Sequence, residues 1–442
     1  MGPVPHGCGS GRGGAAVRAT LTQYRSFDRA IRLLLLNQLG INLGFYMLMP
    51  YLADHLSVGL GLAGWLVGLV LGVRNLSQQG MFLVGGSLAD RFGYKPLIVA
   101  GCALRTAGFG LLAVVDSLPA LVVASAATGF AGALFNPAVR AYVAHDAGER
   151  RVEAFALFNV FYQTGILVGP LVGVALTNVD FRVTAGVAAI VFAGLTVLQA
   201  RELPSRRAES GRAERVLTEW RAVLTNRPFL LFSLVMIGSY VLQFQVYLSL
   251  PLEIRRLASN ETSATAGVAA LFATSGLLAV LCQVRFTAWL KQRVPPSRAM
   301  ALGLGLMSVA FLPPGLAAVL PEVGTSGWWG TVIAFAPVVL CGLTLTMGTL
   351  VLYPFEMDTI VTLSGNRLVA THYGLYNTLS GLGITLGNLG AGGALDLARD
   401  WGQPGLPWLT LGVVGVACVG ALAFLERTGR LTADVTAKAP VV

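Results

Sequence analysis

A single arginine stands in an otherwise apolar stretch: Arg74 lies within residues 61–84, which carry no other charged side chain. A lone charge in such surroundings is energetically expensive and usually faces a polar cavity. At helical spacing Gln78 shares the face of Arg74, and Asn75 and Gln79 form the adjoining stripe. The pattern predicts a binding surface with one positive charge, although helix carbonyls or neighbouring amides could also satisfy the guanidinium.

Other polar side chains in apolar segments could complete this surface. The candidates all lie inside apolar segments, and they are Asn37, Asn42, Tyr46, Arg105, Tyr240, Gln243 and Tyr247. For Arg105 a binding role and a structural role both stay open. Together these residues predict a polar and aromatic cavity for an amphipathic small molecule, which could be zwitterionic or anionic.

A carboxylate that exchanges protons inside a membrane must be partly buried. The first six apolar segments contain no Asp or Glu in their interiors. Glu356 is the best candidate because the apolar run before it would draw it inward, but a solvated helix end is an open alternative. Asp358, Asp90 and His372 are further candidates, and His372 could equally be a surface residue.

Composition places these residues in a membrane. The 442 residues are 55% hydrophobic and 12% charged, with a mean hydropathy of +0.70, whereas soluble proteins average about 25% charged. We therefore expect an all-α integral membrane protein with twelve transmembrane helices in two pseudo-symmetric six-helix bundles. The segments are 30–53, 61–84, 96–115, 119–141, 155–178, 183–200, 229–252, 264–288, 299–320, 328–352, 371–394 and 406–425.

The distribution of basic residues predicts the orientation. Most Lys and Arg fall on one side when the segments alternate, so that side and both termini are expected in the cytoplasm. The net charge of +10 then reflects insertion and contact with anionic lipids, with no nucleic-acid partner. The expected domains are a disordered N-tail (1–29), two bundles (30–200 and 229–425), a linker (201–228) with a short amphipathic helix near Val216–Leu224, and a C-tail (426–442).

The turn after the second segment carries a family motif. Gly86, Leu88, Ala89, Asp90, Arg91, Gly93 and Lys95 resemble the G-x-L-A-D-R-x-G-x-K signature of major facilitator superfamily transporters. The resemblance implies a charged clasp that holds the outward-facing state, made by Gly86, Asp90, Arg91, Gly93 and Lys95 with Arg140, Arg150 and Arg151. Tyr94 replaces a second basic residue, and a turn whose charges merely stay in water is the alternative.

A second motif, Gly165, Gly169, Pro170 and Gly173, is similar to the antiporter signature of that superfamily. Small residues four apart allow close helix packing, and proline bends a helix. The resemblance implies a kinked hinge at the interface between the two halves and favours exchange over uptake. Simple helix packing would explain the glycines but not the placement of the proline.

The stretches from Leu71 to Gly93, from Leu104 to Phe109 and from Pro404 to Trp408 resemble the MdtH-type multidrug efflux branch of the superfamily. That resemblance implies a monomeric, proton-coupled exporter of drug-like compounds in the cytoplasmic membrane, with a role in antibiotic resistance. The alternatives are an exporter of one metabolite or lipid, and a receptor or scaffold that does not transport. The sequence contains no phosphate-binding loop, hydrolase motif or metal-ligand spacing, so we expect no enzyme and no cofactor.

Overall fold

The computed structural model describes residues 11–177, 180–206, 216–319 and 328–430, and within these ranges every regular element is helical. Eight helical stretches there are long and apolar enough to cross a membrane. An all-helical membrane fold is therefore confirmed, while the count of twelve spans stays a prediction. The ends of the predicted tails and residues 207–215 of the predicted linker lie outside the described residues.

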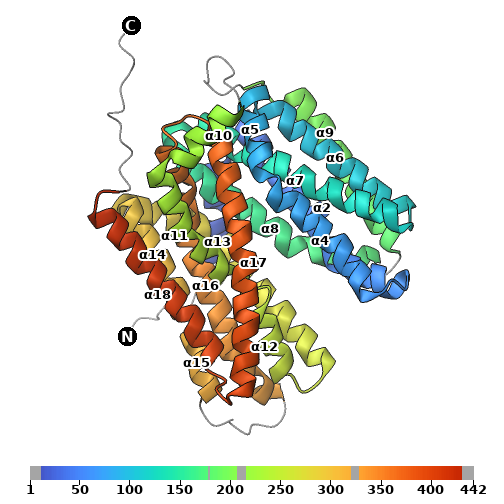
Figure 1. Ribbon diagram of the computed structural model, residues 1–442, viewed down its shortest axis with the longest axis vertical. Coiled ribbons are helices and arrows are strands. Elements are labelled where there is room, and N and C mark those ends of the chain that lie inside the picture. Colours follow the sequence, from blue (N-terminus) through green and yellow to red (C-terminus); the bar gives the residue numbers. More distant parts are fainter. Residues whose placement is uncertain (1–10, 178–179, 207–215, 320–327, 431–442) are drawn as a thin grey trace, which may run out of the picture.

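Helices α2 to α9 pack as one bundle, called here the N-half (Figure 1). Its elements are α2 (Arg29–Tyr46), α3 (Met49–Asp54), a π-helical turn (His55–Gly59), α4 (Gly64–Gly80), α5 (Phe82–Phe92), α6 (Tyr94–Val114), α7 (Leu118–Ala147), a 3-10 turn (Gly148–Arg150), α8 (Arg151–Thr177) and α9 (Phe181–Glu202). Helix α7 is central, since α4, α5 and α6 all pack on it. Phe109 of α6, Phe135 of α7 and Phe192 of α9 are fully buried in the core of the N-half.

Helices α11 to α18 form a second bundle, called here the C-half. Its elements are α11 (Arg227–Phe244), α12 (Ser249–Leu257), α13 (Glu261–Arg293), α14 (Pro296–Val309), α15 (Leu312–Val319), α16 (Trp328–Leu363), α17 (Val369–Asp400) and α18 (Leu406–Arg427). Helix α16 packs on both α13 and α14, and α17 packs on α11. The two halves meet where α5 contacts α17 and α8 contacts α13 and α16.

Helix lengths differ from the apolar segments in the sequence. Four predicted segments are broken helices, namely α2 with α3, α4 with α5, α11 with α12, and α14 with α15. Helix α16, in contrast, continues to Leu363 through Pro354. Proline is tolerated inside membrane helices where neighbouring helices and side chains satisfy the backbone groups it frees. Glu356 and Asp358 thus lie inside α16, and the expectation that they follow this helix is wrong.

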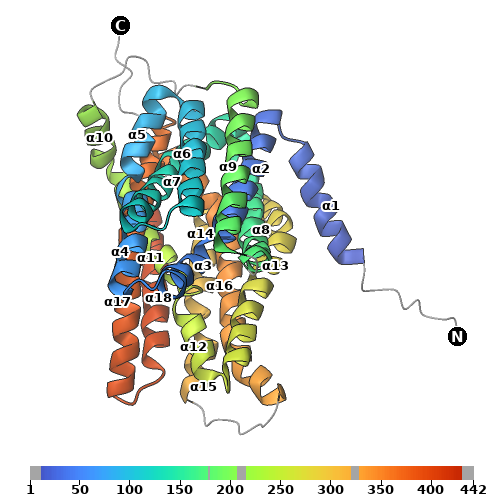
Figure 2. The same ribbon diagram turned by 90° about the vertical axis from the view of Figure 1, so that its right-hand side faces the viewer.

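One end of the molecule, called here the linker end, carries α10 (Val216–Thr225) and the turn at Gly93 (Figures 1 and 2). The predicted amphipathic linker helix is confirmed by α10. Its Val223 is buried, and Trp220 Nε1 donates to Ser87 Oγ at 2.6 Å. Gly93 has φ of 93°, a conformation that favours glycine, and lets α6 begin directly after α5.

Residues Gly11–Arg25 form helix α1, which extends away from the bundle beside α13 (Figure 2). The predicted disorder of 1–29 therefore does not hold for this stretch. Its second half contains Ala, Leu, Arg and Gln, which favour helix. The ring of Tyr24 stacks on Phe161 of α8 at 5.4 Å and anchors the end of α1.

Glycines allow the helices of the N-half to touch through their backbones. A Cβ on Gly85 of α5 would lie 2.0 Å from the carbonyl oxygen of Ala133 in α7. Such close approach supplies the packing that drives helix association in lipid, where no hydrophobic effect operates between helices. Gly72 of α4, by contrast, faces open space, and a Cβ added there would meet no described atom within 4 Å.

These two glycines give a matched test of the packing. We expect Gly85→Ala to lower the thermal unfolding midpoint of the purified protein, because the methyl group must push α5 from α7 at a cost of about 1–3 kcal/mol. Gly72→Ala should leave the midpoint unchanged or raise it slightly. Tryptophan fluorescence during heating measures both, and equal midpoints for the two variants would contradict the backbone contact.

Candidate functional site

Asp90, at the end of α5, caps a helix of the other half. Its carboxylate accepts hydrogen bonds from the backbone N–H groups of Ala370 at 3.2 Å and Thr371 at 2.7 Å, and from the Thr371 hydroxyl at 2.7 Å. The first N–H groups of a helix have no partner inside that helix and carry its positive dipole end. Asp90 is only 5% exposed. One buried carboxylate of the N-half therefore holds the start of α17 in the C-half.

Two glycines bring α5 and α17 close enough for this cap. A Cβ on Gly86 would lie 2.2 Å from the carbonyl oxygen of Ala370, and one on Gly374 would lie 2.4 Å from that of Phe82. Either methyl group would overlap backbone, which cannot move aside like a flexible side chain. The two helices are therefore in direct backbone contact at the linker end.

The arginines predicted to surround Asp90 have other partners. Arg151 Nε contacts Asp358 of α16 at 2.5 Å, and Arg140 Nη1 donates to Asn377 Oδ1 of α17 at 2.6 Å. Both interactions join the N-half to the C-half. Arg91 is exposed, and Lys95 is half-buried. The clasp thus consists of a helix cap at Asp90 with separate arginine contacts beside it, in place of one cluster around the carboxylate.

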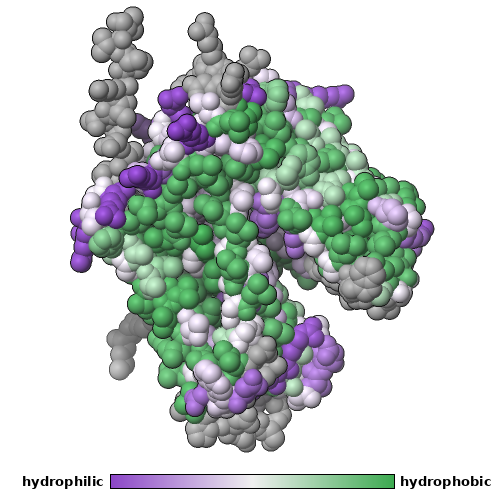
Figure 3. All heavy atoms as spheres, in the orientation of Figure 1, coloured by the Kyte–Doolittle hydropathy of each residue, from purple (hydrophilic) through white to green (hydrophobic). Residues whose placement is uncertain are grey.

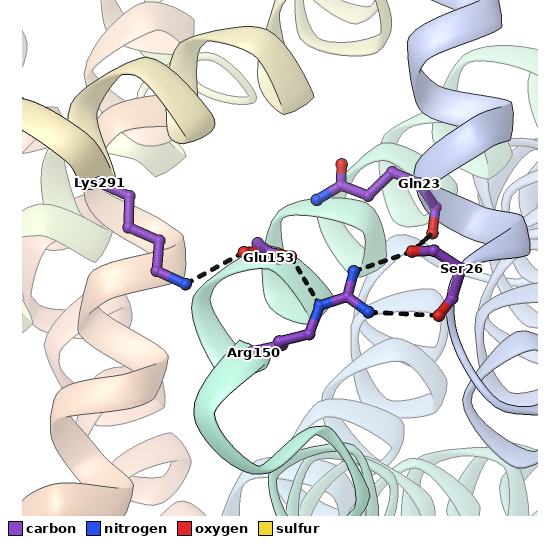
Figure 4. A network of polar contacts seen from close by, with 5 residues as sticks. All are labelled: Gln23, Ser26, Arg150, Glu153 and Lys291. Atoms are coloured by element: carbon purple, nitrogen blue, oxygen red, sulfur yellow. Dashed lines mark hydrogen bonds and ion pairs between the residues drawn. The ribbon is translucent and has the colours of Figure 1, made fainter.

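Another ionic contact between the halves lies at the start of α8 (Figure 4). Lys291 of α13 approaches Glu153 Oε1 at 3.1 Å, and Arg150 Nε donates to Glu153 Oε2 at 2.9 Å. Arg150 also donates to Ser26 through its hydroxyl at 2.8 Å and its carbonyl at 3.2 Å, which ties in the segment after α1. The linker end is therefore closed by a helix cap and several ion pairs.

The glycines of the second motif pack α8 against α2 within the N-half. Cβ positions on Gly165, Gly169 and Gly173 would lie 2.6 Å from Asn42 Cβ, 2.8 Å from Tyr46 Cβ and 2.2 Å from the carbonyl oxygen of Met47. These contacts lie inside the N-half, because the glycine face meets α2 and α3 of the same half. Only Pro170 of the motif borders the space between the halves.

A cavity of about 480 Å³ lies between the two halves. Figure 3 shows a hollow between the two parts of the molecule, where they diverge away from the linker end. The lining residues come from α2, α8, α11, α13 and α16 and the chain after α11, and include Tyr46, Gln163, Pro170, Gln243, Tyr247, Phe272, Thr346 and Thr349. The described residues that line it are mostly apolar, with a few amides and hydroxyls and no charged side chain. Its size is typical of small-molecule sites.

Three predicted cavity residues, Tyr46, Gln243 and Tyr247, line this space. The others lie elsewhere. The Asn42 amide donates to the backbone carbonyl of Gln38 at 2.7 Å, and the Thr378 hydroxyl donates to the backbone carbonyl of Gln79 at 3.1 Å. The ring of Tyr240 packs on that of Tyr376. A separate cluster inside the N-half holds the rest, namely Asn37, Arg74, Asn75, Gln78 and Arg105.

Glu356 is buried in the C-half at 2% exposure, which excludes the alternative of a solvated helix end. The hydroxyl of Tyr376 donates to its carboxylate. Arg140 of the N-half interacts with the same carboxylate electrostatically and donates to Asn377, the residue after Tyr376. A buried acid of the C-half and a half-buried arginine of the N-half thus interact across the interface between the halves.

The other acidic and basic candidates are engaged at the linker end. Asp358 pairs with Arg151, and Asp90 caps α17. His372 is 4% exposed and not a surface residue; its Nδ1 lies 2.8 Å from the carbonyl of Leu368, and its Nε2 lies 3.2 Å from Asn226 Nδ2. Glu356 takes part in none of these contacts: its carboxylate accepts a hydrogen bond from Tyr376 and interacts with Arg140 of the N-half.

Sequence reasoning missed the partners contributed by α17 and α13. Thr371, Tyr376 and Asn377 complete the contacts of Asp90, Glu356 and Arg140. Asn159 of α8 donates to Gln283 of α13 at 2.7 Å, a buried amide contact between the halves. A weak internal repeat in the sequence pairs Phe158 and Asn159 with Tyr376 and Asn377, and it could have singled out the two asparagines.

Residues 34–388 match the family model of the Major Facilitator Superfamily. The chain belongs to this superfamily. It is thus a multi-pass membrane transporter, and the prediction that it is no enzyme is confirmed. It is 51% identical to an uncharacterized MFS-type transporter of Mycobacterium tuberculosis over 91% of this chain and 94% of the relative. It is 31% identical to the multidrug resistance protein MdtH of Yersinia enterocolitica, over 90% and 94% of the two chains.

Two solved transporter structures share the fold. The human organic anion transporter MFSD10 (TETRAN) superposes with a TM-score of 0.67 at 16% identity, over 89% of this chain and 99% of that one. The peptide transporter POT superposes with a TM-score of 0.63 at 16% identity, over 93% and 99%. At this identity the likeness extends to the fold alone.

Asp90→Asn tests the helix cap of this superfamily member. The amide loses the charge that attracts the start of α17, and each charge-assisted hydrogen bond is worth about 1.5–3 kcal/mol. We expect spin labels at the exposed positions Phe92 and Arg367, one in each half, to report longer and broader distances at the linker end.

Asp116→Asn is the matched control, since Asp116 pairs with Arg182 within the N-half at the opposite end. It should leave the label distances unchanged. The capping role is wrong if Asp90→Asn gives the same narrow distance distribution as the unaltered protein.

Proposed function

We propose that the chain exports small amphipathic compounds across the cytoplasmic membrane in exchange for protons, by alternating access. The observation that carries the proposal is the cavity between two halves that are closed at one end. The cap at Asp90 and the pairs of Arg151 and Lys291 close the linker end. The hollow in Figure 3 lies on the other side of this closure. Rocking the halves about the cavity would expose it to each side in turn.

The proposed orientation places the linker end in the cytoplasm. Arg91, Lys95, Arg150, Arg151 and Lys291 all belong to this end, as the positive-inside rule requires of a cytoplasmic face. The described conformation would then be outward-facing, with both termini and the linker inside the cell. The proposed transport unit is a monomer of twelve spans, in which the broken helices α2/α3, α4/α5, α11/α12 and α14/α15 each count once.

The cavity supports amphipathic cargo. Its lining is largely apolar, while Gln163, Gln243, Thr346 and Tyr247 offer hydrogen bonds without a fixed charge. Such a surface binds varied compounds through apolar contact and orients them weakly, because few polar groups must be matched. The name of the MdtH relatives, multidrug resistance protein, agrees with export of this kind. We therefore propose multidrug efflux as the function.

Proton coupling is assigned to Glu356. Its burial, the Tyr376 hydroxyl and the Arg140 charge allow the carboxylate to exist in either protonation state. Loss of its negative charge would leave the half-buried Arg140 without that attraction, which is costly for a cation partly removed from water. Protonation would thereby weaken the interactions of Arg140 with α16 and α17 and favour movement of one half relative to the other.

The deciding experiment uses energised inverted vesicles that contain the protein and a pH-sensitive dye. Addition of an exported compound should release protons and restore the quenched dye fluorescence. Vesicles without the protein provide the background. If a chemically broad panel of amphipathic compounds accumulates in the vesicles without releasing protons, export stands and proton antiport fails.

Gln243→Ala tests the cavity. Loss of one hydrogen bond of about 0.5–1.5 kcal/mol should raise KM for an exported compound by about 2- to 13-fold. Gln403→Ala, the same substitution on the exposed turn between α17 and α18, should change nothing. Equal KM values for the two variants across several compounds would exclude this cavity as the binding site.

Glu356→Gln tests the coupling role. The amide keeps the shape of the side chain but cannot release a proton, so dye dequenching should be abolished. Exchange of labelled for unlabelled compound across the membrane needs no net proton movement and should persist. Glu253→Gln is the control, because Glu253 is also buried but pairs with Arg256 in α12. Persistent dequenching in Glu356→Gln would reassign coupling to another group.

A further inference from the structure

A cluster of polar side chains inside the N-half is separate from the cavity between the halves. It is formed by Arg74 and Gln78 of α4, Arg105 of α6 and Asn37 of α2. Arg74 Nη2 donates to Gln78 Oε1 at 3.2 Å. None of these four residues is among those that line the central cavity. We call this group the arginine cluster.

A glycine makes room for the arginine cluster. A Cβ on Gly132 of α7 would lie 3.0 Å from Gln78 Nε2 and 3.3 Å from Arg105 Nη2. The amide and the guanidinium therefore meet over the bare backbone of α7. Asn37 of α2 lies beside the same stretch of α6, since its Oδ1 lies 3.9 Å from the sulfur of Cys102, which is one helical turn before Arg105. Four helices thus converge on one small volume.

The arginine cluster has two positive charges and no matching negative one. The six apolar segments of the N-half contain no Asp or Glu. Arg74 and Arg105 interact with each other as like charges. Aromatic rings compensate in part: Arg74 lies 4.4 Å from the Phe45 ring centre, and Arg105 lies 5.8 and 5.6 Å from those of Phe135 and Phe192. Rings attract a cation far more weakly than the hydration it has lost.

Several donors in the arginine cluster have no acceptor among the described residues. They are buried N–H groups, namely Arg74 Nε, Arg105 Nε and Nη1, and Asn37 Nδ2. Arg105 is 5% exposed and Asn37 is fully buried. Buried polar groups are nearly always hydrogen-bonded, so unused donors on three neighbouring helices require an explanation. Donors with net positive charge are complementary to an anion and repel a cation.

We propose that the arginine cluster binds a small monovalent anion, either free chloride or a carboxylate group. One anion between Arg74 and Arg105 would accept the unused N–H groups and halve the excess charge. It would also link α2, α4 and α6 around Gly132, and so stabilise the N-half as a rigid unit. The proposal concerns a site apart from the central cavity and does not depend on which compound is exported.

The test measures the thermal unfolding midpoint of the purified full chain by tryptophan fluorescence. Sodium HEPES, whose anion is too bulky for the site, is replaced at constant sodium by sodium chloride or sodium acetate. We expect a saturable rise of about 2 °C or more with at least one small anion, because a ligand that binds only the folded state stabilises it. Chloride alone would identify a resident ion, and acetate would identify a carboxylate site.

Arg105→Gln and Arg74→Gln should abolish the anion-dependent rise. Arg285→Gln removes the same charge from an exposed position of α13 and should retain it. Arg105→Lys serves if Arg105→Gln does not fold, since it keeps the charge but loses the planar fork; its half-saturating anion concentration should be at least about tenfold higher. An unaltered protein with one midpoint in all three salts, or Arg105 variants that respond normally, would overturn the proposal.

Discussion

The arrangement of the two halves depends on how a helix end is satisfied away from water. The first N–H groups of α17 lie inside the protein, where each unpaired group would cost several kcal/mol. Asp90 supplies the missing acceptor from the other half. It can do so because Gly86 and Gly374 bring the backbones of α5 and α17 into contact. Asp90, Gly86 and Gly374 therefore set the approach of α5 to α17, and the ion pairs beside them complete the closed linker end.

Contacts within a half differ in kind from those between halves. Within the N-half, α5, α6, α7 and α8 pack chiefly through apolar side chains and glycines, and the arginine cluster is an internal polar exception. Between the halves, the contacts that carry specificity are ionic or amide, such as Arg151 with Asp358 and Asn159 with Gln283. Water can replace these polar partners at modest cost, whereas it cannot replace lost apolar packing. Rigid halves with a separable interface follow from this difference.

The sequence predicted the class of fold and the linker helix, and it selected Asp90 and Tyr247, which lie where the halves meet, and the buried Glu356. Hydropathy detects what lies in lipid, so it did not show the breaks in α2/α3 or the extension of α16 beyond residue 352. The partners of Asp90 are backbone groups 280 and 281 positions away. Every residue type except proline has such an N–H, so no local pattern identifies them. The motif glycines were noticed for their spacing, but spacing does not say which helix they face.

Arg140 shows how the two kinds of contact can be coupled. It belongs to α7, the helix on which α4, α5 and α6 pack, so a force on its side chain acts on the whole N-half. Its partners, Asn377 and Glu356, belong to two helices of the C-half. A change of charge at Glu356 therefore alters an interaction between rigid bodies and is not absorbed by one flexible side chain. A single protonation at this place could bias the arrangement of the halves, which the same event at the exposed Glu261 could not.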